Sequence, residues 1–274
     1  MKTWLITGAS SGLGLEMTQQ LLARGDRVAA AVRRPDPLQA LQEQYGDRLR
    51  IHGFDMTDTD AMRREVENAF TACGTIDYIV SNAGYGLFGA AEELTDAQIE
   101  RQLATNLTGS IQLVRAVLPW LRKQGGGRIV QVSSEGGQVA YPNFSLYHAS
   151  KWGIEGFLEA VAQEVKPFGI DVVIAEPGPT QTGFGAGLDH AKPLAVYDQT
   201  PAGEVRRGIA NGSFDIRGDA ARTVAAMITV AEAPNPPFRV PLGSIAWEHL
   251  VATLSGRLAE IERQREIAWS ADAS

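Results

Sequence analysis

The chain has 274 residues, which is enough to bury a substantial core in one large domain or two small ones. Hydrophobic residues make up 44% and charged residues 21% of it, and the formal net charge of −7 argues against a nucleic-acid or anionic-membrane partner. A single cysteine, Cys73, excludes an internal disulfide framework, and the four histidines lack metal-ligand spacing, so no metal site is expected.

The N-terminus shows no pattern of a targeting segment. Only a short apolar run precedes Thr7 and Gly8, which is too short for a signal peptide. No apolar stretch of about 18 residues follows that could cross a membrane. We therefore expect a cytoplasmic protein.

Strand-like and helical patterns alternate through most of the chain. Apolar, strand-like runs lie at 3–7, 27–32, 48–54, 77–81, 127–133 and 170–175, with a last one at 238–242. Helical patterns lie between them at 13–24, 37–45, 59–72, 96–123, 145–167 and 217–232. Strands that are apolar throughout and separated by helices predict a parallel sheet covered on both faces. The expected fold is α/β, with one doubly wound parallel sheet of about seven strands and helices on both faces.

Two segments depart from this alternation. Residues 178–215 are rich in Gly and Pro with scattered apolar residues, which is typical of a lid over a ligand. The second segment is a predicted helix from about 244 to 268, and we expect residues 244–274 to form a helical extension packed on the domain formed by residues 1–243. Its apolar residues recur at helical spacing and must be buried, within the subunit or on a partner: Trp247, Leu250, Val251, Leu254, Leu258 and Ile261.

The first strand leads directly into a glycine-rich turn, TGASSGLG, at residues 7–14. Glycines at such a turn let the backbone approach a pyrophosphate, and the N-terminus of the following helix offers free N–H groups and a positive dipole end. The candidate phosphate-binding residues are Gly8, Ser10, Ser11, Gly12, Leu13 and Gly14.

The same turn also satisfies GxSxG, the nucleophile elbow of α/β-hydrolases, which would make Ser10 the nucleophile of an esterase. Such an enzyme needs an oxyanion donor from the loop of an earlier strand and a later histidine on a loop. No strand precedes this one in the sequence, and the late histidines are His190 in the predicted lid and His249 in a predicted helix. The esterase is therefore kept only as an alternative.

A tyrosine and a lysine stand four residues apart in SLYHASK, residues 145–151. On a helix, Tyr147 and Lys151 would share one face. A phenol with a pKa near about 10 is a poor acid–base catalyst at neutral pH, and a nearby ammonium would lower that value. The pair therefore suggests a tuned proton donor.

Five motifs in order resemble those of the short-chain dehydrogenase/reductase family: TGASSGLG, NAG at 82–84, Ser134 thirteen residues before Tyr147, YHASK, and PGPTQT at 177–182. The resemblance covers about residues 3–182. It implies a single-domain Rossmann fold, a nicotinamide cofactor, and hydride exchange between that cofactor and a carbonyl or alcohol.

The resemblance also implies a role for each catalytic residue. Tyr147 would donate the proton to the carbonyl oxygen, while Lys151 lowers its pKa and binds the nicotinamide ribose. Ser134 would polarise the substrate carbonyl, with its neighbour Ser133 as the alternative. Asn106, in the middle of a predicted helix, would help to hold a water beside the lysine.

Further residues are implied in cofactor binding. They are Asp55 and Met56 after the third strand, Asn82, Ala83 and Gly84 after the fourth, and Pro177, Gly178, Thr180 and Thr182 in PGPTQT. An NAD-binding unit places a carboxylate near the end of the second strand to bind the ribose 2′-OH. Here Val32 stands in that place and is followed by Arg33 and Arg34. We therefore predict NADP(H), with Arg33 as the first candidate for the 2′-phosphate contact.

The substrate remains open at this stage. Glu135 follows Ser134 directly and could bind a cationic or hydroxylated substrate or point into solvent. Aromatic residues near the motifs suggest an apolar pocket wall: Tyr85, Tyr141, Phe144 and Phe184, with Phe88 nearby. The family resemblance implies a homodimer or homotetramer acting on a small carbonyl or alcohol. A protein that binds NADP(H) as a sensor without turnover is a second alternative.

Overall fold

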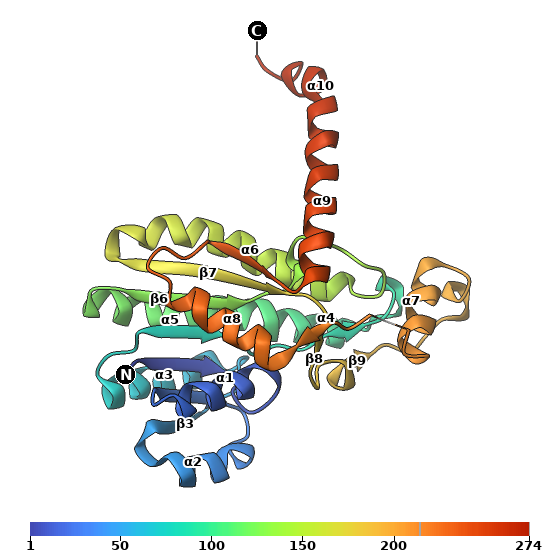
Figure 1. The fold of residues 1–274 in the computed structure, drawn as a ribbon. Coiled ribbons are helices and arrows are strands. Elements are labelled where there is room, and N and C mark those ends of the chain that lie inside the picture. The colour runs from blue at the N-terminus through green and yellow to red at the C-terminus, as the bar shows by residue number, and fades with distance from the viewer. Residues whose placement is uncertain (214, 274) are drawn as a thin grey trace.

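A seven-stranded parallel sheet runs through the centre of the molecule (Figure 1). The computed structural model describes residues 1–213 and 215–273. The strand order of the sheet is β11-β7-β6-β4-β1-β2-β3, and every neighbouring pair of strands is parallel. The strands are β1 (Thr3–Thr7), β2 (Arg27–Val32), β3 (Leu49–Gly53), β4 (Tyr78–Ser81), β6 (Gly127–Val132), β7 (Ile170–Pro177) and β11 (Arg239–Leu242). The predicted fold class is confirmed.

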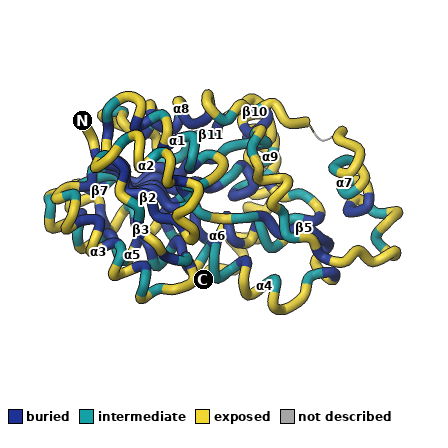
Figure 2. Tube along the Cα trace, turned by 90° about the horizontal axis from the view of Figure 1, so that it is seen from below, coloured by how far each residue is buried: buried dark blue, intermediate teal, exposed yellow. Residues whose placement is uncertain are grey.

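The strands are apolar throughout because both faces of the sheet are covered. In β1, Trp4 and Ile6 pack into the cluster on one face, and Leu5 packs into the cluster on the other. Figure 2 shows the buried residues gathered along the central strands, between the helices. This two-sided burial is why the strands read as continuous apolar runs in the sequence.

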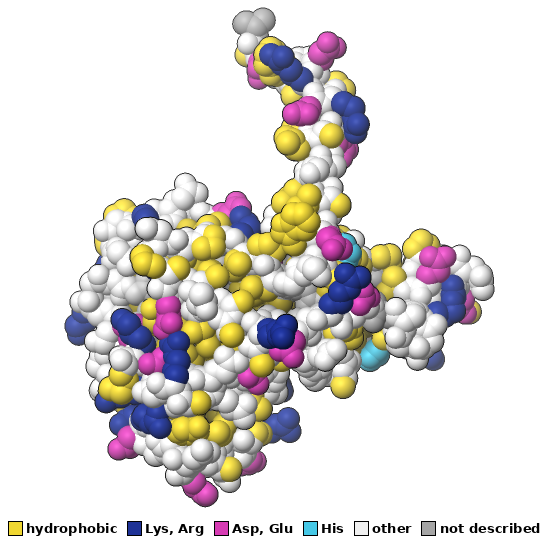
Figure 3. All heavy atoms as spheres, in the orientation of Figure 1, with side chains coloured by type: hydrophobic (Ala, Val, Ile, Leu, Met, Phe, Trp, Pro, Cys, Tyr) yellow, Lys and Arg dark blue, Asp and Glu magenta, His cyan; other side chains and the backbone are white. Residues whose placement is uncertain are grey.

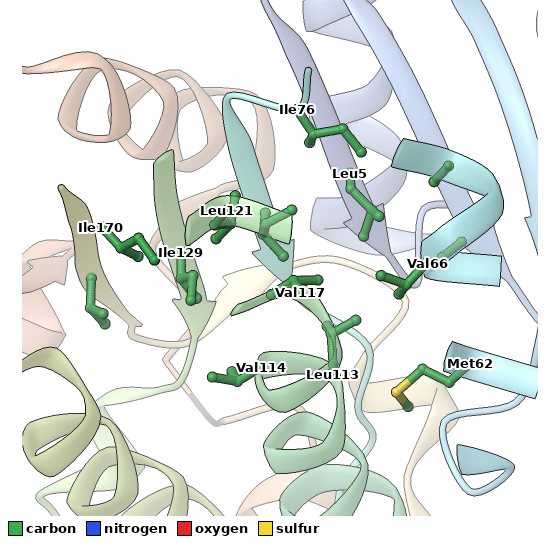
Figure 4. Close-up of a cluster of buried hydrophobic side chains, with 14 of the residues drawn as sticks. Leu5, Met62, Val66, Ile76, Leu113, Val114, Val117, Leu121, Ile129 and Ile170 are labelled. Atoms are coloured by element: carbon green, nitrogen blue, oxygen red, sulfur yellow. The ribbon is translucent and has the colours of Figure 1, made fainter. Parts of the chain in front are cut away.

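Helices form a layer on each face of the sheet. On one face, α1 (Gly12–Ala23) packs beside α8 (Ala220–Glu232), with α2 (Gln39–Tyr45) near the sheet edge. On the other face lie α3 (Thr59–Cys73), α5 (Gly109–Gln124) and α6 (Ser145–Val165). Figure 4 shows part of this second core, where Met62 and Val66 of α3 and Leu113 and Val117 of α5 gather beside Leu5 of the sheet.

The helix predicted at 96–123 is interrupted in the structure. α4 (Asp96–Leu103) and α5 are joined by a π-helical turn, Ala104–Thr108. Within that turn, the side chain of Asn106 accepts a hydrogen bond from the Tyr85 backbone N–H (3.1 Å) and donates one to the Tyr85 carbonyl (2.8 Å). A regular helical pattern in the sequence does not show such a wide turn, which is frequent at functional sites.

The segment predicted as an irregular lid contains regular structure. It holds β8 (Thr180–Gln181), β9 (Asp189–His190) and α7 (Pro201–Ala210); β9 pairs with β5 (Leu87–Phe88), and β8 pairs with β10 (Gly218–Asp219). α7 begins where Thr200 accepts a hydrogen bond from the Ala202 N–H and Pro201 takes the first helical position. Phe214 of the predicted lid and Ser274 of the predicted extension lie outside the described residues.

The C-terminal extension differs from the expectation that it packs along the domain. α9 (Ser244–Arg263) and α10 (Arg265–Trp269) project from the domain as an arm, residues 244–269 (Figure 1). Only its base is buried, through Ile245, Ala246 and Leu250. The amphipathic pattern predicted a helix correctly, but a pattern cannot say which surface covers the apolar side. No helix in the described part of the chain is long and apolar enough to span a bilayer.

Candidate active site

A cavity of about 1120 Å³ opens at the carboxyl ends of β1, β4, β6 and β7, beside the point where the strand order reverses. This edge is where ligands bind in open α/β sheets. Most residues proposed from the sequence line it: Gly8, Ser10, Ser11, Gly12, Leu13, Arg33, Asp55, Met56, Asn82, Ala83, Gly84, Tyr85, Ser134, Glu135, Tyr141, Phe144, Tyr147, Lys151, Pro177, Gly178, Thr180, Thr182 and Phe184. Gly14, Arg34 and Asn106 are not among its lining residues.

The glycine-rich turn leaves room for a ligand against the backbone. Gly8 and Gly12 adopt positive φ angles of 67° and 52°. A Cβ on Gly14 would lie 2.4 Å from the Gly8 carbonyl oxygen, so this position tolerates no side chain. α1 begins at Gly12, and the side chain of its N-cap, Ser11, makes no capping hydrogen bond. Free N–H groups at the positive end of a helix fit the pyrophosphate of a dinucleotide.

A threonine that the sequence analysis missed ties this turn to the NAG segment. Thr7 Oγ1 accepts hydrogen bonds from the backbone N–H groups of Asn82 (3.0 Å) and Ala83 (3.1 Å). The Asn82 side-chain amide donates to the Thr7 carbonyl at 2.9 Å. The Asn82 side chain therefore holds the ends of β1 and β4 together. Thr7 has no signal of its own in the sequence, because threonine at a strand end is common.

Replacing Gly14 by Ala tests this packing. We expect a loss of stability on the order of 1–3 kcal/mol, because the added methyl group must displace backbone atoms, together with weaker binding of a dinucleotide at this turn. Gly156→Ala is the matched control, since Gly156 lies exposed on α6 with no atom within 4 Å of an added Cβ. That control should be neutral or slightly stabilising. Thermal unfolding and NADPH fluorescence titration measure both effects, and equal behaviour of the two variants would contradict the close packing.

Tyr147 and Lys151 lie one helical turn apart in the N-terminal half of α6. The Lys151 ammonium nitrogen is 5.6 Å from the centroid of the Tyr147 ring and donates a hydrogen bond to the Val132 carbonyl at 2.9 Å. Burial lowers the pKa of Lys151 to about 8, although the charge of Glu155 partly opposes this shift. The lysine is thus held by the end of β6, directly beside the phenol.

The pKa of Tyr147 differs from the sequence prediction. Burial raises it to about 12; a hydrogen bond with Ser134 opposes the shift, and the negative charge of Glu135 adds to it. Desolvation of the phenol is the largest of these effects. Tyr147 therefore stays protonated at neutral pH, which is the state that a proton donor requires.

The two neighbouring serines point to different partners. Ser134 lies at the N-cap of a short 3₁₀ turn, where its Oγ accepts from the Gly136 N–H at 3.1 Å. It also makes the hydrogen bond with Tyr147. Ser133 is buried, and its hydroxyl donates to Glu155 at 2.5 Å. Both serines line the cavity, but the hydroxyl of Ser133 is engaged with Glu155, whereas that of Ser134 faces Tyr147.

Asn106 lies in the π-helical turn beside the cavity. It is buried and does not line the cavity, and both ends of its amide are bonded to the Tyr85 backbone. These bonds hold the segment after Gly84 against the π-helical turn. The Asn106 side chain acts here as a positioning group for the cavity wall.

Glu135 does not point into solvent. It is 3% exposed and lines the cavity, with Oε2 3.0 Å from Nδ1 of His249. The Tyr141 hydroxyl is also 3.0 Å from that nitrogen. Burial and the nearby Glu135 both raise the pKa of Tyr141. This cluster fastens the base of α9 to the cavity wall; His249 could not be linked to it from the sequence because 114 residues separate it from Glu135.

Aromatic rings surround Tyr147, as the sequence suggested. The ring centroids of Phe184 and Phe144 lie 5.7 Å and 6.1 Å from that of Tyr147, and Phe88 is buried behind Phe144. Several lining residues were not predicted: Arg101, Thr105, Leu188, Asp189, Ile209 and Ile216. They come from α4, from the α4–α5 junction, from the segment predicted as a lid over a ligand and, for Ile216, from just after that segment.

At the end of β2, Arg33 is exposed and lines the cavity. Its Nη1 lies 3.8 Å from Oδ2 of Asp55. Burial alone would raise the pKa of Asp55, but hydrogen bonds from Thr57 and the charge of Arg33 bring it below its usual value. At this edge of the cavity, the ionised carboxylate of Asp55 thus faces the exposed guanidinium of Arg33.

Comparison with known proteins agrees with this geometry. A family model described as short chain dehydrogenase matches residues 2–193. The oxidoreductase BOA17 of Botryotinia fuckeliana is 32% identical over 98% of this chain and 96% of its own length. A 3-ketodihydrosphingosine reductase of Bacteroides thetaiotaomicron is 34% identical over 88% and 87% of the two chains. The crystal structure of a short-chain dehydrogenase from Streptomyces avermitilis has a TM-score of 0.91 and 33% identity, covering 99% of this chain and 100% of that one.

The fold and these matches define the class of the protein as a Rossmann-fold oxidoreductase. The chain belongs to the short-chain dehydrogenase/reductase family.

Proposed function

We propose that the protein is an NADP(H)-dependent reductase of ketones or aldehydes. The observation that carries this proposal is the convergence of Ser134, Tyr147 and Lys151 on one cavity, next to the glycine-rich turn. A bound nicotinamide supplies or accepts the hydride. The relative named 3-ketodihydrosphingosine reductase takes, by its name, a keto compound, which supports a ketone as the substrate class.

The chain's own residues supply proton transfer and polarisation. Tyr147, held protonated by burial, donates its proton to the carbonyl oxygen. The Ser134 hydroxyl donates a hydrogen bond to the same oxygen as negative charge develops on it. Lys151 provides a positive charge close to the resulting phenolate. Reduction is the proposed cellular direction, because it follows from the proposed use of NADP(H) if the NADP pool is kept reduced.

The proposed preference for NADP(H) over NAD(H) is argued from the residues at the end of β2, which form one edge of the cavity. Val32 occupies the place where an NAD-binding unit carries an acid, and Arg33 directly follows it. The Arg33 side chain is 70% exposed, so its donors can reach a 2′-phosphate. Asp55, beside Arg33, is proposed to contact the adenine and to orient the guanidinium. These features support NADP(H) over NAD(H).

Two alternatives can be separated by one assay. A sensor that binds NADP(H) would show no turnover, and an esterase would hydrolyse esters through Ser10. In the described part of the chain, no histidine hydrogen-bonds to Ser10, and His249 is bonded to Glu135 and Tyr141 instead. Incubation with NADPH and a panel of ketones and aldehydes, followed by absorbance, tests the proposal. Loss of NADPH supports it, and ester hydrolysis without NADPH loss would contradict it.

The pKa of Lys151 predicts how kcat/KM for the reduction depends on pH. Its pKa of about 8 means that the ammonium is charged below that pH and neutral above it. Burial raises the pKa of Tyr147 to about 12, so ionisation of the phenol does not limit the reduction near pH 8. We expect kcat/KM for reduction to be level below pH 7 and to fall as the pH rises through about 8. A profile from pH 6 to 10 measures this, and a level profile up to pH 10 would contradict the role of Lys151.

The proposed assembly is a homodimer or homotetramer. Proteins that this one resembles associate through the helices corresponding to α4–α5 and α6. Light scattering at micromolar concentration measures the mass against the 29.5 kDa of one chain. A mass of one chain would contradict the proposal.

A further inference from the structure

Two glutamates depart from the usual position of acidic side chains. Figure 3 shows acidic side chains exposed on the surface of one face of the molecule, which is where they are normally found. Glu155 on α6 and Glu176 near the end of β7 are instead only 2% and 1% exposed. The Nε of Arg239 on β11 lies 3.1 Å from Oε2 of Glu155 and 3.6 Å from Oε1 of Glu176. The same guanidinium therefore faces two buried carboxyl groups.

The contacts favour one negative charge and one proton on this pair. Glu155 accepts hydrogen bonds from the Ser133 hydroxyl and from Nε of Arg239, and both donors stabilise a carboxylate. Burial raises the pKa of Glu155, but these two hydrogen bonds oppose the shift. Burial also raises the pKa of Glu176, and there the charge of Glu155 adds to the shift. The charge therefore lies on Glu155, while Glu176 keeps its proton and donates it in a hydrogen bond to Glu155.

The pair lies directly behind the turn that carries the catalytic serine, residues 133–138, which we call the serine segment. At its start, the Ser133 hydroxyl donates to Oε1 of Glu155 at 2.5 Å. At its end, the Gln138 amide donates to Oε1 of Glu176 at 2.5 Å. The two carboxyl groups therefore hold the serine segment from behind at both ends.

We propose that Glu155 and Glu176 are positioning residues, which place the Ser134 hydroxyl at the carbonyl oxygen by holding the serine segment. This inference rests on the reduction proposed above. The fit is close, because a Cβ on Gly137 would collide with Oε1 of Glu155. A misplacement of about 1 Å can lower a rate by a factor of about 10². Loss of the charged acceptor at Glu155 releases the segment, whereas Glu176 needs only a neutral group that donates and accepts.

The first experiment replaces glutamates that contact Arg239. Glu155→Gln removes the charge, and we expect kcat for carbonyl reduction to fall roughly tenfold to a hundredfold while KM changes little. Glu176→Ala should lower kcat as well, and Glu176→Gln should restore it, because an amide resembles the protonated carboxyl group. Glu159→Gln is the matched control, since Glu159 contacts Arg239 from the exposed side of α6, and it should keep the wild-type kcat. A loss in Glu176→Gln with full activity in Glu155→Gln would overturn the proposal.

The second experiment asks whether Glu155 acts through Ser134. Glu155→Gln is compared in the wild-type and in the Ser134→Ala background, which forms a double-mutant cycle. The charge of Glu155 also raises the pKa of Lys151, so kcat is taken from the low-pH plateau of each pH profile. We expect the full loss in the wild-type background and little further loss where the Ser134 hydroxyl is absent. Equal losses in both backgrounds would overturn the proposal.

Two further outcomes are decisive. If Glu155→Gln does not fold, Ser133→Ala replaces it in the same cycle, because that variant removes only the hydroxyl that joins Glu155 to the serine segment. A wild type that consumes no NADPH with any carbonyl compound would contradict the proposed reaction and this inference together. Turnover of the wild type that Glu155→Gln leaves unchanged would overturn this inference alone.

Discussion

Replacing Tyr147 by Phe is expected to lower kcat for carbonyl reduction by a factor of about 10² to 10⁴, the usual contribution of general acid catalysis. The phenyl ring keeps its contacts with Phe144 and Phe184, so the cavity wall stays in place. Only the transferable proton and the hydrogen bond with Ser134 are lost. Steady-state turnover with NADPH and fluorescence titration of NADPH binding separate the chemical effect from the binding effect.

The control for this variant is Tyr45→Phe, because Tyr45 lies on α2 and does not line the cavity. It should keep wild-type turnover. Retention of more than about a tenth of the activity by Tyr147→Phe would exclude Tyr147 as the proton donor. A loss of NADPH binding in that variant would instead assign the ring a structural role.

The second large effect is expected on cofactor choice. A charge-assisted hydrogen bond contributes about 1.5–3 kcal/mol, and about 1.4 kcal/mol corresponds to a factor of ten. Arg33→Ala should therefore lower the ratio of kcat/KM for NADPH to that for NADH by one to two orders of magnitude. The activity with NADH should change little, since the 2′-OH of NADH does not need the guanidinium.

Arg34→Ala is the matched control, because Arg34 is also exposed but does not line the cavity. It should leave the cofactor ratio unchanged. A shift in Arg34→Ala and none in Arg33→Ala would move the phosphate contact to Arg34. Equal kcat/KM for the two cofactors in the wild type would contradict the preference for NADP(H) itself.

The sequence predicted those parts of the site that depend on short spacing. The turn after β1, the Tyr147–Lys151 pair on α6 and Ser134 at the end of β6 all reach one cavity, because the carboxyl ends of parallel strands meet at the same edge of the sheet. Their order along the chain is enough to infer that they converge. The seven strands could be predicted for a similar reason, since burial on both faces leaves continuous apolar runs.

Other features could not be predicted because they depend on distant partners. The contact of His249 with Glu135 joins α9 to the 3₁₀ turn after β6, and neither segment carries a local sign of it. The π-helical turn at Asn106 results from hydrogen bonds to Tyr85, which no helical period reveals. The apolar side of α9 predicted burial, but the same pattern fits packing on the domain or on another molecule.

The most direct test of the proposed reaction follows the hydride itself. NADPH carrying deuterium at C4 of the nicotinamide is incubated with the protein and with each ketone or aldehyde that it consumes, and the alcohol product is analysed by mass spectrometry. Hydride transfer in the cavity beside Tyr147 predicts one deuterium on the former carbonyl carbon, from one of the two C4 positions only. An alcohol product without deuterium from either labelled form, or no consumption of NADPH with any carbonyl compound, would contradict it.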